Sequence, residues 1–293
     1  MRRTGLQSFG GLTLSISLLC AAPALAGSDP SPEGRWVGGF DNRGGVIAVD
    51  ARIEGGASLS GTIALPQRAE IGIPLRNVSA RGRTLSFEVP GAESNLLFEG
   101  RFETPTRVRG SVRQGLGYSR FELLKVASLP TADLEAVYGT YTWGDDHVLL
   151  IAPGEAQPIY VDYETGRTGA LFPMSRDEFV AGPTMASGYP VMLRARTQRD
   201  ASGRVEAVTL ERQTRTVRAV RREFYREVPV RVPGRDVSLG ATLLLPATPG
   251  PHPALVMIHG SGPVTRDALR PFADHFARHG VAAGEVERPL ADA

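Results

Sequence analysis

The chain has 293 residues, enough for two or three domains of ordinary size. Hydrophobic residues make up 42% and aromatic residues 7%, with 34 glycines and 22 prolines, a composition more typical of a turn-rich β protein than of a helical one. The formal net charge of +2 implies neither a nucleic-acid partner nor a strongly basic partner.

Residues 1–26 have the pattern of a secretory signal. Arg2 and Arg3 precede a short apolar stretch, and the segment closes on Ala24-Leu25-Ala26, so cleavage after Ala26 is predicted. We therefore expect an exported protein, periplasmic or extracellular, with no integral membrane segment after cleavage. Cys20 leaves a lipoprotein as an alternative, although Leu19 stands where a lipobox needs a small residue. The cleaved chain would have no cysteine, which excludes disulfides and thiol chemistry.

Short apolar runs, separated by Gly, Asn and Pro turns at intervals of about ten residues, follow the signal. They predict an antiparallel sandwich or small barrel over 27–130 and a second β module over 131–215. The expected strands are 35–40, 46–53, 59–65, 85–89, 96–102, 108–112 and 121–124, then 138–143, 148–151, 160–163, 179–181 and 205–210.

Several polar and aromatic groups in these modules have a plain structural interpretation. Asp145-Asp146-His147 resembles a metal cluster, but turn residues of a hairpin explain it better, so no metal site is expected. An arginine series is interleaved with glutamates, which favours solvated strand faces over nucleic-acid binding. We expect Trp36 and Trp143 to pack in cores. The arginines are Arg212, Arg215, Arg218, Arg221 and Arg222.

The pattern changes in residues 216–293. Strands are expected over 224–232 and 237–245, then a fully apolar strand over 254–258. A helix is expected over 265–279, with Thr265 as N-cap, and His275 and His279 as surface or capping residues. Its predicted apolar face consists of Leu269, Phe272, Ala273 and Phe276.

Residues 224–282 resemble the opening of an α/β-hydrolase domain, as found in secreted serine esterases and prolyl-oligopeptidase-like peptidases. Leu239–Pro246, His252-Pro253, Ile258–Pro263 and Arg266-Asp267 carry the resemblance. It implies the incomplete start of a doubly wound sheet, a small-molecule ester or peptide substrate, and no cofactor. It also implies an oxyanion-hole loop, whose backbone N–H groups would face the substrate carbonyl. The residues of that loop are His259, Gly260, Ser261 and Gly262.

The catalytic residues of such a hydrolase cannot be identified. No serine stands in a Gly-x-Ser-x-Gly elbow, and no acid and histidine follow it. Glu285, Glu287 and Arg288 do not suit a strand buried on both faces, so we expect a truncated or frame-shifted end. The chain is thus predicted to be an inactive serine-hydrolase family member. The alternative is a non-catalytic envelope β protein that binds a ligand or partner.

Overall fold

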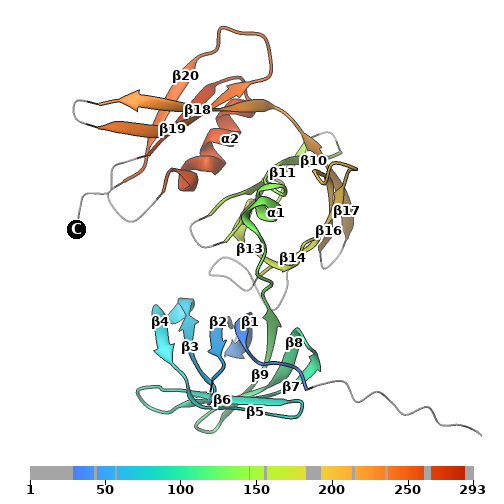
Figure 1. The fold of residues 1–293 in the computed structure, drawn as a ribbon, viewed down its shortest axis with the longest axis vertical. Coiled ribbons are helices and arrows are strands. Elements are labelled where there is room, and N and C mark those ends of the chain that lie inside the picture. Colours follow the sequence, from blue (N-terminus) through green and yellow to red (C-terminus); the bar gives the residue numbers. More distant parts are fainter. Residues whose placement is uncertain are drawn as a thin grey trace, which may run out of the picture.

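The computed structural model describes residues 29–42, 45–56, 58–144, 146–154, 157–182, 193–212, 215–234, 237–260 and 265–287. Its strands form three sheets that follow one another along the chain (Figure 1). Strands account for 62% of the structure and helices for 9%, which confirms the expectation of a mostly β protein with barrel-like sheets.

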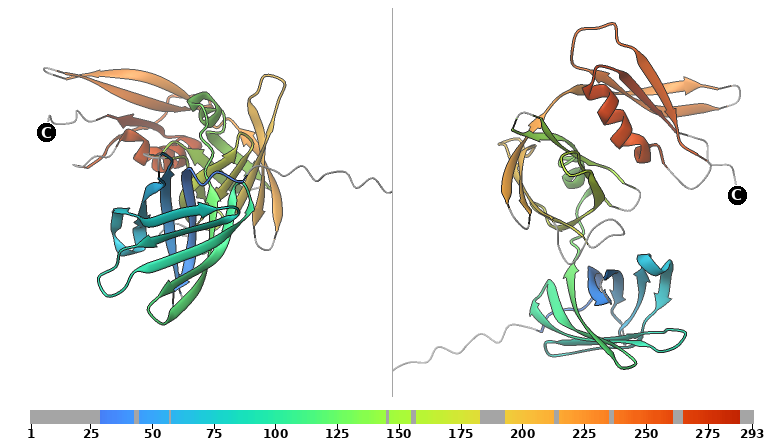
Figure 2. Two further views of the ribbon diagram at one scale, coloured as in Figure 1. Left: turned by 60° about the horizontal axis from the view of Figure 1, so that its bottom comes forward. Right: turned by 180° about the vertical axis from the view of Figure 1, so that it is seen from behind.

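The first sheet has nine antiparallel strands in the spatial order β4-β3-β2-β1-β9-β8-β7-β6-β5. The edge strands β4 and β5 are neighbours in sequence, and between them Leu75 N–H donates to Gly61 O on β3 at 2.9 Å. The sheet therefore curls into a nearly closed barrel (Figure 2). The elements are β1 (Gly34–Asn42), β2 (Gly45–Glu54), β3 (Ser60–Leu65), η1 (Pro66–Arg68), β4 (Glu70–Pro74), β5 (Arg76–Arg81), β6 (Thr84–Val89), β7 (Leu96–Thr104), β8 (Arg107–Gln114) and β9 (Gly117–Lys125).

Alternation of side chains along these strands fills the first barrel. On β7, Leu96, Phe98 and Phe102 are buried while Glu99 and Arg101 are exposed, as a strand with one face in the core requires. The interior is rich in aromatic rings, and Phe98 lies 4.7 Å from Phe87, centre to centre. The expectation that Trp36 packs in a core is confirmed, since it is fully buried there.

The second sheet is a closed barrel of eight strands, in which the first strand, β10, pairs with the last, β17. Closure leaves no unpaired sheet edge. The strands are β10 (Gly139–Trp143), β11 (His147–Ala152), β12 (Ile159–Asp162), β13 (Arg167–Ser175), β14 (Glu178–Ala181), β15 (Leu193–Arg199), β16 (Val205–Arg212) and β17 (Thr216–Arg222).

The short helix α1 (Thr131–Glu135) precedes the closed barrel, and the residues after it pack against the barrel interior. Tyr141 OH donates to Val137 O at 2.6 Å, and Arg221 Nη2 donates to Tyr141 OH at 2.7 Å. Arg221 also donates to Ala136 O at 2.7 Å. One member of the arginine series thus fastens the segment that follows α1 to the barrel.

The alkaline stability of the closed barrel should depend on Tyr141. Burial raises the pKa of Tyr141 to about 12, and the charge of Arg221 only partly opposes this. The folded barrel therefore holds the phenol proton more tightly than the unfolded chain does, and stability falls as the pH rises from about 10 through about 12. We expect a loss of about 2–3 kcal/mol across that window. Denaturant titrations followed by Trp143 emission at pH 9 and pH 12 measure it.

A matched pair of phenylalanine variants separates Tyr141 from the other tyrosines. Tyr141→Phe should flatten the pH dependence by about the same 2–3 kcal/mol. Tyr118→Phe, at an exposed position of the first barrel, should leave the dependence unchanged. Equal pH dependence in Tyr141→Phe and the parent protein would contradict the assignment.

The two barrels contact each other through an apolar cluster, to which Val37 and Leu124 contribute from the first barrel and Phe172 and Val180 from the second. Arg35 adds a hydrogen bond across this contact, from Nη2 to Gln157 Oε1 at 2.9 Å. Its guanidinium also lies 5.4 Å from the centre of the Phe172 ring. The linker between β9 and α1 therefore passes beside a packed interface.

The third sheet has four strands in the order β18-β19-β21-β20. Only β20 and β21 are parallel, and the helix α2 connects them and packs on one face of the sheet. The elements are β18 (Tyr225–Pro233), β19 (Ser238–Pro246), β20 (Ala254–Ile258), η2 (Arg266–Leu269), α2 (Arg270–Arg278) and β21 (Ala282–Val286).

The recognition of the chain as an α/β-hydrolase is wrong. The structure is almost entirely β, with one closed and one nearly closed barrel, and does not have the start of a hydrolase sheet. A strand, a glycine-rich turn and a helix specify one local strand–helix–strand unit. A doubly wound sheet needs several such units with helices on both faces, whereas the described residues contain one parallel pair and one covering helix.

Two finer expectations in this region are also wrong. The buried residues of α2 are Arg270, Ala273, Asp274 and Ala277, whereas Phe272 and Phe276 are exposed. The strand β21 is central and completely buried, although it contains Glu285. Both errors have one cause: charged residues were assigned to the surface, but here they are buried as ion pairs. The predicted signal at 1–26 lies outside the described residues, and the predicted module boundaries stay predictions.

Candidate ligand site between the two barrels

A cavity of about 680 Å³ lies where the first barrel meets the second. It is surrounded by the start of β1, the end of β2, the β7–β8 turn, the linker that precedes α1, and β13. This volume is within the range of pockets that hold small organic molecules. Its lining residues are Gly34, Arg35, Arg52, Ile53, Glu54, Thr106, Lys125, Val126, Ala127, Ser128 and Met174.

Lys125, the only lysine of the sequence, lines this junction cavity at the end of β9. Its Nζ donates to Ser31 O at 3.2 Å and lies 5.5 Å from the centre of the Trp36 ring. Gly34 has a φ of +123°, and a Cβ at Gly34 would lie 2.9 Å from Lys125 Cε. The absence of a side chain at residue 34 thus lets the lysine stem pass beside β1 and present its ammonium group at the cavity.

The cavity combines positive charge with an apolar wall. Val126 and Met174 contribute apolar surface, while Lys125 and Arg52 contribute cations. Neither cation forms an ion pair with a carboxylate of the described residues, whereas Arg35 forms one with Asp50 at 2.7 Å. The carboxylate of Glu54 offsets part of this charge. The remaining excess of positive charge suits an anion with an apolar part.

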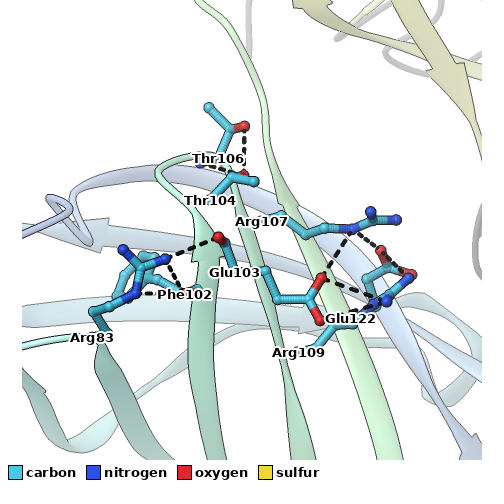
Figure 3. Close-up of polar contacts among 8 residues, drawn as sticks. All are labelled: Arg83, Phe102, Glu103, Thr104, Thr106, Arg107, Arg109 and Glu122. Atoms are coloured by element: carbon cyan, nitrogen blue, oxygen red, sulfur yellow. Dashed lines mark hydrogen bonds and ion pairs between the residues drawn. The ribbon is translucent and has the colours of Figure 1, made fainter. Parts of the chain in front are cut away.

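A neighbouring charge cluster does not neutralise the cavity. Figure 3 shows Glu122, on the outer face of β9, between Arg107 and Arg109. Glu103 also contacts Arg109, at 3.5 Å. The side chain of Glu122 is 3% exposed and is paired with both arginines, and in the described residues it forms no ion pair with Lys125. The charges of this ion cluster therefore balance one another. The turn that holds Thr106 separates the cluster from the cavity, whose positive charge is in excess.

Two other cavities have lining residues that suit a ligand less well. One of about 860 Å³ lies on the third sheet, and one of about 660 Å³ lies at the opposite end of the first barrel. The latter carries a single arginine, Arg68, and a single carboxylate, Glu93. The third-sheet cavity has one arginine, Arg226, against the two unpaired cations of the junction cavity, Lys125 and Arg52.

The structure describes two of the four residues of the predicted oxyanion-hole loop, His259 and Gly260. His259 is buried after β20, and its Nδ1 lies 3.0 Å from Gly260 O. Ser261 and Gly262 lie outside the described residues, as does Asp145 of the turn that resembled a metal cluster. No protein-family model matches the chain, and no curated protein matches it. The loop's role therefore stays a prediction from the sequence.

Other expected groups are spread over the molecule. In the described residues, no group of three or more His, Cys, Asp or Glu side chains could hold a metal ion. No helix of the described residues is long and apolar enough to cross a membrane. Within the arginine series, Arg212 pairs with Asp162 and Glu164, and Arg215 with Glu164.

Sequence reasoning missed both Lys125 and the buried Asp274. The only signal for Lys125 in the sequence is that it is the single lysine among 33 basic residues. Asp274 gave no signal, because its partners come from three separate segments. Thr140 on β10, Tyr225 on β18 and Tyr163 after β12 all donate to its carboxylate.

Proposed function

We propose that the protein is a non-catalytic binding protein of the cell envelope, and that the junction cavity holds an amphipathic organic anion. The observation that carries the proposal is that one cavity has both an apolar wall and two cations, Lys125 and Arg52. The predicted signal at 1–26 supports an envelope location.

The expected ligand follows from the two parts of the lining. An acidic head group would contact the Lys125 ammonium, and a hydrogen bond between charged groups contributes about 1.5–3 kcal/mol. The apolar part would cover Val126 and Met174, which adds a contribution proportional to the apolar area removed from water. A carboxylate, sulfonate or phosphate with a short apolar body meets both requirements.

The charge requirement can be measured with two dyes that differ by one group. 1-Anilinonaphthalene-8-sulfonate is anionic, and N-phenyl-1-naphthylamine is its neutral counterpart. In a Trp143→Phe background, Trp36 is the remaining tryptophan, and a bound dye should quench its emission. We expect Lys125→Met, which keeps the alkyl stem over Trp36, to weaken binding of the sulfonate about tenfold, or roughly 1.4 kcal/mol. Binding of the neutral dye should change less than about twofold.

Two control variants test the position as well as the charge. Lys125→Arg should restore most of the affinity for the sulfonate, whereas Arg76→Met removes an exposed cation of β5 and should have no effect. Because Lys125 carries the only side-chain amine, its acylation by an N-hydroxysuccinimide ester can be followed by mass spectrometry. The bound sulfonate should protect it. Unchanged affinity in Lys125→Met together with unprotected Lys125 would refute the proposal.

A further inference from the structure

Two buried side-chain nitrogen atoms in the described part of the chain make no hydrogen bond, and they belong to neighbouring side chains. They are Trp143 Nε1, at the end of β10, and Arg212 Nη2, at the end of β16. The Arg212 guanidinium lies 5.2 Å from the centre of the Trp143 ring. Buried donors are nearly always paired in folded proteins, so two adjacent ones indicate an acceptor that the described residues do not supply.

The carboxylates nearby are already occupied. Arg212 Nη2 lies 2.7 Å from Asp162 Oδ2 as an ion pair, but not in the direction of a hydrogen bond. Asp162 Oδ1 accepts the backbone N–H of Glu164 at 3.1 Å. Glu164 accepts hydrogen bonds from Arg212 and Arg215, each at 2.6 Å. An acceptor for the indole N–H therefore has to come from outside this cluster.

The indole ring itself leaves only an edge for a ligand. His147 stacks on Trp143 with ring centres 5.4 Å apart and an angle of 23° between the planes. Arg212 also covers the ring. The side chain of His147 is 42% exposed, so solvent reaches one side of this stacked pair. A small group that approaches in the plane of the ring fits this arrangement, whereas a ring stacked on the indole does not.

The charge at this rim decides the class of ligand. Arg212 and Arg215 are balanced by Asp162 and Glu164. A further carboxylate would lie close to Asp162 in a poorly solvated place, where like charges disfavour each other. An uncharged oxygen carries no such penalty. We propose that the rim of the closed barrel binds the carbonyl oxygen of an uncharged amide, such as a peptide group, through Trp143 Nε1–H and Arg212 Nη2–H.

The two indole N–H signals in a ¹H–¹⁵N spectrum test this second site directly. Trp36 Nε1 already donates to Pro32 O at 2.7 Å, so its signal is an internal reference. Titration with N-methylacetamide should move the Trp143 signal downfield with saturation and leave the Trp36 signal in place. Acetate, a charged ligand of similar size, should cause no saturable shift. The variant Trp143→Phe assigns the two signals.

Two variants keep the proposal falsifiable. Arg212→Met should weaken amide binding at least about fivefold, and His147→Ala, which keeps both donors and removes the ring stacked on the indole, should retain the saturable shift. A Trp143 signal that stays in place, that moves linearly together with Trp36, or that acetate moves equally well would overturn the proposal. Loss of the shift in His147→Ala would also overturn it.

Discussion

Asparagine in place of Asp274 is expected to detach α2 from the closed barrel. The carboxylate of Asp274 is fully buried and accepts four hydrogen bonds from three parts of the chain. Thr140 Oγ1 donates at 2.6 Å and Tyr225 OH at 2.9 Å, while the single O–H of Tyr163 is shared between Asp274 at 3.0 Å and Pro271 O at 2.8 Å. Arg278 Nε donates at 2.8 Å. No other described carboxylate connects the closed barrel, β18 and α2 in this way.

The size of the effect follows from the charge of Arg278. Its side chain is 9% exposed and pairs with Asp274, so an amide at residue 274 leaves a buried guanidinium without a counter-charge. Breaking a buried ion pair by removing one partner costs about 3–5 kcal/mol. Burial and the charge of Asp274 raise the pKa of Tyr163 and Tyr225, so both phenols stay protonated as donors to this carboxylate.

Hydrogen exchange followed by mass spectrometry measures this loss locally, which is needed because three sheets do not unfold as one two-state unit. Amides of 270–286 should exchange about 100-fold faster or more in Asp274→Asn, while the strands of the first barrel stay unchanged. The same change at Asp267, in η2, should have little effect. Equal protection of 270–286 in the Asp274 variant and the parent protein would contradict this role.

Alanine at Glu285 is expected to unfold the third sheet locally, with an effect of similar size. Glu285 is fully buried in β21, and Arg270 Nη2 lies 2.9 Å from its carboxylate. Arg270 also contacts the more exposed Glu227 at 2.7 Å. Burial alone would lower the pKa of Arg270, but the two carboxylates outweigh burial and raise it. Removal of Glu285 therefore leaves the buried Arg270 with only the half-exposed Glu227 as its counter-charge, at a cost of up to about 3–5 kcal/mol.

A double substitution distinguishes the cost of an unpaired charge from that of a lost contact. Arg270→Met with Glu285→Leu removes both charges and should restore most of the stability, since buried ion pairs are often replaced by apolar groups without loss. Glu287→Ala should cost less than about 1 kcal/mol, because its pair with Arg266 is half-exposed at 3.8 Å. Exchange rates of 238–246 and 282–286 measure all three variants. A double variant as unstable as Glu285→Ala would contradict the ion-pair argument.

Local pattern in the sequence was sufficient for many of the strands. The alternation in β7 and the apolar run of β20 both predicted strands that the structure contains. Strands such as β15 (Leu193–Arg199) and β17 (Thr216–Arg222) were missed. Their outward faces carry arginines, so their apolar residues are too few to produce a clear period.

Pairing between distant segments could not be predicted in the same way. The closure of the second barrel depends on contacts between β10 and β17, as at Thr140 and Arg222, and no local signal links these two strands. The junction cavity has the same origin. Lys125 and Met174 are brought together only when the two barrels pack, so neither residue indicated a ligand site by itself.

The sequence by itself determined the β-rich class, many of the strands and the position of the helix, because these depend on the period of nearby side chains. Only the tertiary structure decided that the barrels close, that Glu285 lies in a central strand and that Lys125 faces a cavity. The physical reason is that a charge is buried or exposed according to its partners. The partners of Glu285 and Asp274 come from other segments, beyond the reach of a local pattern.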